Sequence, residues 1–365
     1  MVKFIHTSDF QLGMTRWFLE GEAQARFNDD RMESVVRLGE LARETGAEFI
    51  VVAGDVFEHN ALSKNTLSRA KETFRNLPVP VYLLPGNHDP LVADSVLRKP
   101  FADNVHVIAD FAPIEFRPGV EIVGAPYLTK RANYDLVREA LAPLEPYDGV
   151  RIAVGHGQVE ARDSEADVID LRFVEEQIEA GVIDYLALGD THSTQELGSS
   201  GRVWFSGSPE TTAFDDRERG SGNALIVTVD GGEVDVVKHR VGRWHFRALE
   251  ADVNSMEDVE RFLKEVDELP YKRRTAVKYG LRGTVGLEAQ ARLEQGLADL
   301  EPVFASLRPR ERTMDLHLAP SEEELANLDL HGFAADALAD LVGNLHDPVA
   351  RDAANLLFRL TAKEA

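Results

Sequence analysis

The sequence is organised around one stretch, Val81-Tyr82-Leu83-Leu84-Pro85-Gly86-Asn87-His88-Asp89. Its first four residues are apolar and suit a buried β-strand. Pro85 has no backbone N–H and Gly86 accepts dihedral angles that other residues avoid, so the strand should end there. An Asn, a His and an Asp follow directly. The stretch therefore predicts a strand that leads into a polar site.

The same pattern, an apolar strand followed by metal-competent side chains, occurs four more times before residue 193. In residues 49–55 the apolar run is continuous, which is typical of a strand buried on both faces. The carboxyl ends of the strands in an α/β sheet share one edge, so we expect the polar side chains to converge there. These side chains are Asp9 with Gln11, Asp55, Asn87 with His88, His156, and Asp190 with His192.

Helical patterns separate the first strands. Residues 23–45 and 63–76 have helical periodicity, and Ser63 is expected to cap the second helix. The order strand, helix, strand, helix, strand predicts an α/β layer architecture. Further along, Asp230-Gly231-Gly232 predicts a hairpin turn between two strands.

The composition of the chain changes near Val241, and no further strand with a polar end follows. We predict three domains: 1–243 with the polar site, a smaller α+β domain at 244–320, and a helical segment at 321–365. A capping box from Ser321 to Glu324 is expected to begin the last of them.

Composition limits the function and the location. The net charge of −23 should repel nucleic acid on average, so a role on DNA would need a local basic patch, bound metal ions or a basic partner. The chain has no cysteine, which excludes disulfides and thiolate metal sites. Without a signal-peptide pattern or a long apolar run, a cytoplasmic protein is expected.

The strand-end residues point to metal chemistry. A single Asp or His at a strand end is more often a turn or cap residue. The same pattern at five strand ends favours a metal site. The seven of these side chains other than His88 suffice as ligands for two divalent ions if Asp55 contacts both ions. Two such ions can stabilise the attacking and the leaving oxygen of a phosphoryl transfer.

Together these motifs resemble the calcineurin-like metallophosphoesterase superfamily. Within it, the chain is similar to SbcD-type DNA repair exonuclease subunits and their archaeal and eukaryotic relatives over about residues 3–240. The motifs that carry this likeness are His6-Thr7-Ser8-Asp9-Phe10-Gln11-Leu12-Gly13, Gly54-Asp55-Val56-Phe57-Glu58, Gly86-Asn87-His88-Asp89 and Gly207-Ser208-Pro209-Glu210. The resemblance implies a four-layer α/β/β/α sandwich at 1–243 as the nuclease domain, an α+β capping domain and a helical C-terminus.

The resemblance also implies roles for the strand-end residues. One ion would be held by Asp9, Gln11, Asp55 and His192, and the other by Asp55, Asn87, His156 and Asp190. His88 would be the catalytic residue near the scissile phosphate, as a general acid or as a stabiliser of developing charge.

Two positions depart from the family pattern. The family has His where this chain has Gln11, and Gly-His-x-His where it has Gly189-Asp190-Thr191-His192. Gln11 can bind the metal directly or through a water molecule, whereas Asp190 is expected to be a ligand. Both changes replace imidazole by oxygen donors, so we expect the site to prefer Mn²⁺ or Mg²⁺ over softer ions.

The resemblance therefore predicts a two-metal phosphodiesterase, a DNA exonuclease or endonuclease subunit of an SbcCD-like complex. The expected partners are DNA, an SbcC-like ATPase and a second copy of the chain. An amphipathic stretch at 349–360 would dock on the ATPase or pack within the chain. A phosphodiesterase for small nucleotides or other phosphoesters is one alternative, and a weakly active scaffold for the ATPase is another.

Overall fold

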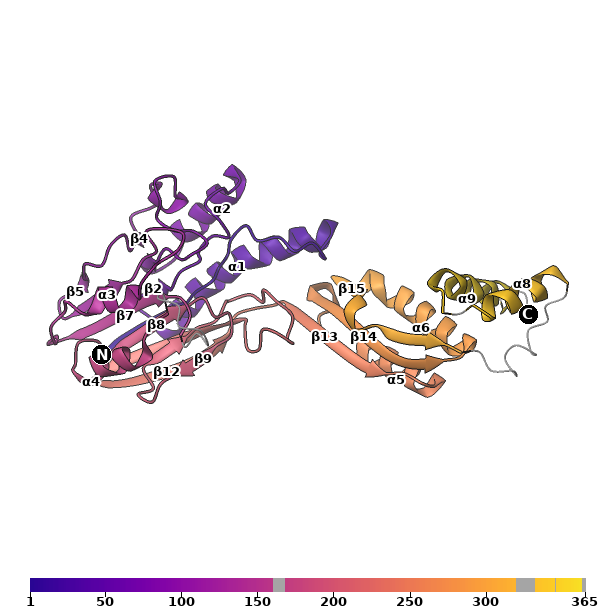
Figure 1. Ribbon diagram of the computed structural model, residues 1–365. Coiled ribbons are helices and arrows are strands. Elements are labelled where there is room, and N and C mark those ends of the chain that lie inside the picture. Colours follow the sequence, from indigo (N-terminus) through magenta and orange to yellow (C-terminus); the bar gives the residue numbers. More distant parts are fainter. Residues whose placement is uncertain (160–167, 320–331, 345, 363–365) are drawn as a thin grey trace. The chain divides into compact units, whose positions relative to one another are not determined.

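The computed structural model of the chain (Figure 1) describes residues 1–159, 168–319, 332–344 and 346–362. The chain forms two compact units, Met1–Trp17 with Gln24–Trp244, and Phe18–Ala23 with His245–Ala365. The predicted capping box from Ser321 to Glu324 lies outside the described residues. In the part of the chain that the structure describes, no helix combines the length and the apolar character needed to cross a membrane.

The first unit contains a six-stranded sheet in the order β12-β11-β1-β2-β3-β4. Its strands β1 to β4 are parallel, and β11 runs antiparallel to both β1 and β12. The turn from β11 to β12 is Gly231-Gly232, where φ is 58° and 86°, so the predicted hairpin is confirmed. The strands are β1 (Val2–Thr7), β2 (Phe49–Val52), β3 (Val81–Leu83), β4 (Val105–Val107), β11 (Asn223–Asp230) and β12 (Glu233–Arg240).

A second six-stranded sheet has the order β5-β6-β7-β8-β10-β9. The four inner strands are parallel, while β5 and β9 pair antiparallel at the two edges. The strands are β5 (Ile114–Arg117), β6 (Val120–Gly124), β7 (Val150–His156), β8 (Tyr185–Gly189), β9 (Gln195–Leu197) and β10 (Val203–Phe205).

Helices cover one face of each sheet. Leu38 of α1 and Phe74 of α2 share an apolar cluster with the first sheet, and Val137 of α3 and Val174 of α4 share another with the second. The remaining faces of the two sheets pack on each other, so the α/β class is confirmed. The helices are α1 (Gly21–Thr45), α2 (Lys64–Arg75), α3 (Leu136–Leu141) and α4 (Leu171–Glu179). Ser63 caps α2 as predicted, since its Oγ accepts from Thr66 N at 3.1 Å.

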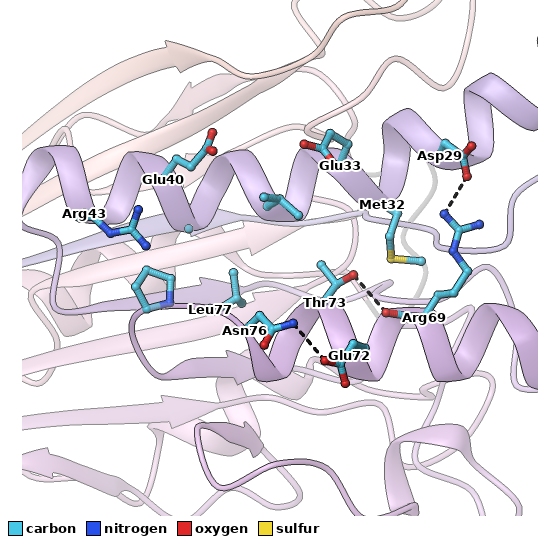
Figure 2. A pocket seen from close by; sticks show the side chains of 13 residues that line it. Asp29, Met32, Glu33, Glu40, Arg43, Arg69, Glu72, Thr73, Asn76 and Leu77 are labelled. Carbon is cyan, nitrogen blue, oxygen red and sulfur yellow. Dashed lines mark hydrogen bonds and ion pairs between the residues drawn. The ribbon is translucent and has the colours of Figure 1, made fainter.

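A groove of about 690 Å³ lies between α1 and α2 (Figure 2). Met32 and Leu77 contribute its apolar surface, and an ion pair joins Asp29 to Arg69 at its edge. None of the predicted metal ligands lines this groove. The site residues therefore lie elsewhere on the unit.

The second unit contains a parallel sheet in which β14 pairs with β13, β15 and β16. Helices connect the first three of these strands, as parallel pairing requires. The strands are β13 (His245–Asp252), β14 (Thr275–Val285), β15 (Ser306–Pro309) and β16 (Asp315–Leu318), and the helices are α5 (Met256–Asp267), α6 (Leu287–Leu300), α8 (Phe333–Val342) and α9 (Pro348–Ala362).

The layer between the two large sheets depends on aromatic packing around Phe49, which is fully buried. Its ring stacks on Phe4 at 5.1 Å and lies 4.6 Å from the Phe116 ring. We expect Phe49→Ala to lower the free energy of unfolding by about 3–5 kcal/mol, because the mutation leaves a cavity in a closely packed core. Urea unfolding followed by circular dichroism measures the change. Val237→Ala, at a half-exposed position, is the control and should stay within about 0.5 kcal/mol.

Candidate metal centre

All eight predicted site residues lie at or just after the carboxyl ends of strands, and they come from both large sheets. Parallel strands bring these ends to one edge, and the face-to-face packing of the two sheets brings the two edges together. Asp9 and Gln11 follow β1, Asp55 follows β2, Asn87 and His88 follow β3, His156 ends β7, and Asp190 and His192 follow β8.

Three of these residues form the centre. Asp9, Asp55 and His156 are buried, and each offers one ligand atom within 4.8 Å of the others. Carboxylate and imidazole at this spacing can hold a divalent ion. Asp55 Oδ1 lies 3.4 Å from His156 Nε2, and Asp55 Oδ2 lies 4.0 Å from His88 Nε2.

The other side chains join the centre from two sides. On one side, His192 Nε2 lies 3.8 Å from Asp9 Oδ1 and 3.3 Å from the amide nitrogen of Gln11. On the opposite side, Asp190 Oδ1 lies 3.7 Å from His156 Nε2 and accepts from Asn87 Nδ2 at 3.2 Å. The structure thus brings all eight residues into one connected cluster.

Several side-chain atoms of the predicted ligands are buried without a hydrogen bond. Among the described residues, Gln11 Oε1, Asn87 Oδ1 and His156 Nε2 make none. A buried polar atom without a partner is costly, and each of these atoms carries a lone pair. Metal coordination would satisfy all three, so the residues fit the two-metal centre of a phosphoesterase.

The histidine hydrogen bonds agree with this arrangement. His156 Nδ1 lies 2.8 Å from the carbonyl oxygen of Ala53, which can only accept, so Nδ1 carries the hydrogen. The Nε2 lone pair of the neutral ring then faces Asp55 and Asp190. Ligating histidines are commonly held in this way by a backbone carbonyl.

A carboxylate that the sequence does not single out orients His192. Glu218 Oε2 lies 3.2 Å from His192 Nδ1, and Thr212 Oγ1 lies 2.5 Å from the same nitrogen while donating to Glu218. This contact leaves Nε2 facing Asp9 and Gln11. Glu218 stands in the charged run Asp215-Asp216-Arg217-Glu218-Arg219, which looks like an ordinary exposed loop, so no pattern in the sequence distinguishes it.

The electrostatics of the cluster favour added positive charge. Burial lowers the pKa of His156, but the contact with Asp55 and the negative charges of Asp9 and Asp190 together outweigh burial and raise that pKa well above its ordinary value. Burial raises the pKa of Asp55, but the contacts with His156 and His88 together outweigh burial and bring that pKa below its usual value. A metal ion can supply the positive charge that the proton on His156 would otherwise provide.

The backbone at the strand ends is unusual. Among the described residues other than glycine, φ is positive at Asp9, Gln11, Asp55, Asp190 and Tyr271, so four of the five are predicted ligands. This conformation is uncommon for side chains other than Asn and Asp, and it concentrates at functional sites. It turns consecutive strand ends toward one centre.

Two glycines make room for the ligands. A Cβ at Gly54 would lie 2.1 Å from His156 Nδ1, and a Cβ at Gly86 would lie 2.1 Å from Asp55 Oδ1. Any side chain there would push a ligand out of place. The Gly-Asp and Gly-Asn-His-Asp motifs therefore need glycine for steric reasons.

Asp89 and His6 support the centre without being ligands. The Asp89 carboxylate accepts from Gly86 N at 2.8 Å and from Phe57 N at 2.9 Å, which ties the loops after β2 and β3 together. His6 Nε2 donates to Leu188 O at 3.1 Å, and its Nδ1 accepts from the Tyr185 hydroxyl at 3.0 Å. Burial lowers the pKa of His6 to about 3, so the ring is neutral and joins the two sheets beneath the centre.

The fold and the cluster define a metal-dependent phosphoesterase. Residues 2–194 match the family model of calcineurin-like phosphoesterases, and this match spans more than half of the 365 residues. The chain belongs to that family.

The proteins similar to this chain include two curated relatives and one solved structure. An uncharacterized metallophosphoesterase, YhaO of Bacillus subtilis, is 24% identical over 350 residues, which are 89% of this chain and 84% of that protein. The DNA double-strand break repair protein Mre11 of Archaeoglobus fulgidus is 34% identical over 91 residues, only 24% of this chain and 19% of that protein. A dimetal phosphatase from Danio rerio aligns with a TM-score of 0.43 and 10% identity, and the alignment covers 66% of this chain and 96% of the phosphatase chain. At that TM-score the alignment does not bear on the family of this chain.

The contact between Glu218 and His192 can be tested by metal binding. We expect Glu218→Ala to weaken Mn²⁺ binding by about 10- to 100-fold, because His192 loses the partner that fixes its ring. Isothermal titration calorimetry measures the affinity, and a melting curve without metal reports any loss of folding. The control is Glu233→Ala, which removes an exposed carboxylate and the same charge. Unchanged Mn²⁺ affinity in Glu218→Ala would contradict the role.

Proposed function

We propose that this chain is a two-metal phosphodiesterase that cleaves DNA, as the nuclease subunit of an SbcCD-like repair complex. The observation that carries the two-metal chemistry is the set of three buried ligand atoms, on Gln11, Asn87 and His156, that lack a hydrogen bond beside the buried Asp55 carboxylate. The similarity of 91 residues to a protein named for DNA double-strand break repair supports DNA as the substrate.

The contacts support a division of the proposed ligands between two ions. Gln11 and His192 touch each other beside Asp9, whereas Asn87 and Asp190 touch each other beside His156. One ion would be held by Asp9, Gln11, Asp55 and His192, and the other by Asp55, Asn87, His156 and Asp190. When bound, two such ions stabilise charge on the phosphoryl group and activate water for attack.

His88 is the proposed catalytic residue because it can deliver a proton. Its Nδ1 lies 3.0 Å from the carbonyl oxygen of Glu58, so Nδ1 carries a hydrogen and the ring is held in one orientation. The Nε2 atom is therefore the one that exchanges protons. In the imidazolium form it would donate its proton to the leaving oxygen and become neutral. The side chain is 42% exposed, which leaves it accessible to a substrate.

We propose that Mn²⁺ or Mg²⁺ is the working metal, since amide and carboxylate oxygens are hard donors. Three carboxylates and two amides stand beside two imidazoles in the proposed ligand set.

Activity measured across a metal series tests this preference. We expect faster phosphodiester hydrolysis with Mn²⁺ or Mg²⁺ than with Zn²⁺ or Ni²⁺, and we expect Gln11→His to shift the preference toward Zn²⁺. Calorimetric titration of both proteins with Mn²⁺ and Zn²⁺ separates binding from activity. Higher activity of the unchanged protein with Zn²⁺ or Ni²⁺ would show the preference to be wrong.

An SbcC-like ATPase and a second copy of the chain are the proposed protein partners. The C-terminal helices expose large apolar side chains, with Phe333 of α8 88% exposed and Val349 of α9 74% exposed. Such residues support docking of this segment on the ATPase. The homodimer rests on the resemblance to SbcD-type subunits alone.

A phosphodiesterase for small nucleotides is the second candidate. The net charge of −23 favours it, because a small substrate needs no long basic track.

One cleavage experiment separates these functions. The protein with Mn²⁺ is incubated with labelled single- and double-stranded DNA, with a cyclic dinucleotide and with bis(4-nitrophenyl) phosphate. We expect DNA cleavage that falls by about 10²- to 10⁴-fold in His88→Ala, because a general acid contributes about that factor. Hydrolysis of the small esters alone would favour the second candidate. Metal binding without hydrolysis of any substrate would favour the third possibility, a weakly active scaffold for the ATPase.

A further inference from the structure

A cavity of about 480 Å³ opens beside the metal centre. Asn87 and His88 line it from the catalytic side, and the other lining residues are Glu58, His59, Tyr127, Lys130 and Arg131. Its volume falls in the range of small-ligand sites, about 300–1,000 Å³. The cavity is therefore large enough for part of a substrate next to the scissile group.

Two adjacent cations distinguish this cavity. Lys130 and Arg131 are exposed, and within the described ranges neither forms an ion pair with a carboxylate. The chain has a net charge of −23, so two adjacent positive charges without a negative partner differ in sign from most of its charged side chains. Arginine presents a planar fork that suits phosphate oxygens, and lysine adds a compact charge.

The segment that carries the cations is tied to the catalytic loop. Tyr127 N donates to Pro85 O at 3.1 Å, and Leu91 N donates to Tyr127 O at 2.7 Å, so both ends of the loop around His88 are joined to Tyr127. The Tyr127 ring also packs edge-on against His156 at 5.9 Å. Lys130 and Arg131 thus begin three residues beyond a buried anchor on the metal centre.

One carboxylate, Glu58, is also among the described lining residues. Its Oε2 atom is buried and makes no hydrogen bond to the described residues. Lys130 and Arg131 outnumber this one carboxylate, so the lining keeps a formal charge of +1 when its histidines are neutral.

We infer that this cavity binds a second phosphate group of the substrate, adjacent to the one that is cleaved, through Lys130 and Arg131. The inference rests on the proposed phosphodiester hydrolysis and narrows its substrate class. Diesters with a neighbouring phosphate, as in an oligonucleotide, are preferred over isolated diesters.

Matched substrates test the inference. The thymidine dinucleotide TpT has one phosphate, whereas pTpTp adds a phosphate at each end. We expect kcat/KM of the full chain with Mn²⁺ to be at least about tenfold higher for pTpTp than for TpT, because charge-assisted hydrogen bonds hold the added group. The double variant Lys130→Ala/Arg131→Ala should lose this preference and keep its rate on bis(4-nitrophenyl) phosphate. Lys64→Ala/Arg75→Ala, which removes two exposed cations from α2, should keep the preference.

The outcomes are separable from those of the proposed function. A preference for pTpTp that persists in the Lys130/Arg131 variant, or an equal loss on all three substrates, would overturn the inference. If the unchanged protein hydrolyses no diester, the proposed function fails, and binding decides the inference. Calorimetric titration with pTpTp in EDTA and low salt should then give about tenfold weaker binding in the Lys130/Arg131 variant than in the Lys64/Arg75 variant. Equal affinities would overturn it.

Discussion

The structure depends on the burial of two carboxylates, Asp9 and Asp55, at the place where the carboxyl ends of two sheets meet. Removing an ionised carboxylate from water costs several kcal/mol unless nearby charges and hydrogen bonds compensate. Their described partners are imidazoles, N–H groups and the Ser8 hydroxyl, which donates to Asp9 at 2.5 Å. Divalent cations would complete this compensation, which would couple metal binding to the stability of the strand ends.

Hydrogen bonds between the two sheets keep this centre in place. His6 on β1 bonds to β8, and His156 on β7 bonds to the carbonyl of Ala53 after β2. Apolar packing between sheets specifies no register, whereas these directional bonds align the two sets of strand ends. The same bonds leave Nε2 of His156 facing the carboxylates. A single arrangement therefore serves the fold and the chemistry.

The charge of the surface and the charge of the site have different consequences. A net charge of −23 repels polyanions at long range, but this effect is screened beyond about 8 Å at physiological salt. Beside the predicted metal ligand Asn87 and His88, Lys130 and Arg131 instead add two positive charges to the lining of one cavity. Such local attraction fits a substrate that is placed by short-range contacts, or delivered by a partner, better than one that is captured by a broad basic surface.

The sequence by itself determined the α/β class and the set of strand-end residues, because a continuous apolar run, a glycine and a polar residue are local signals. It also identified the cap at Ser63 and the hairpin turn at Gly231-Gly232. Only the tertiary structure decided what Glu218, Asp89 and His6 do, since their partners lie 26, 32 and 179 residues away along the chain. It also explains the Gly207-Ser208-Pro209-Glu210 motif, in which buried Glu210 accepts from the backbone of Arg243 and Trp244. Local patterns reveal which side chains leave a strand, but the distance between two of them is set by how the sheets pack.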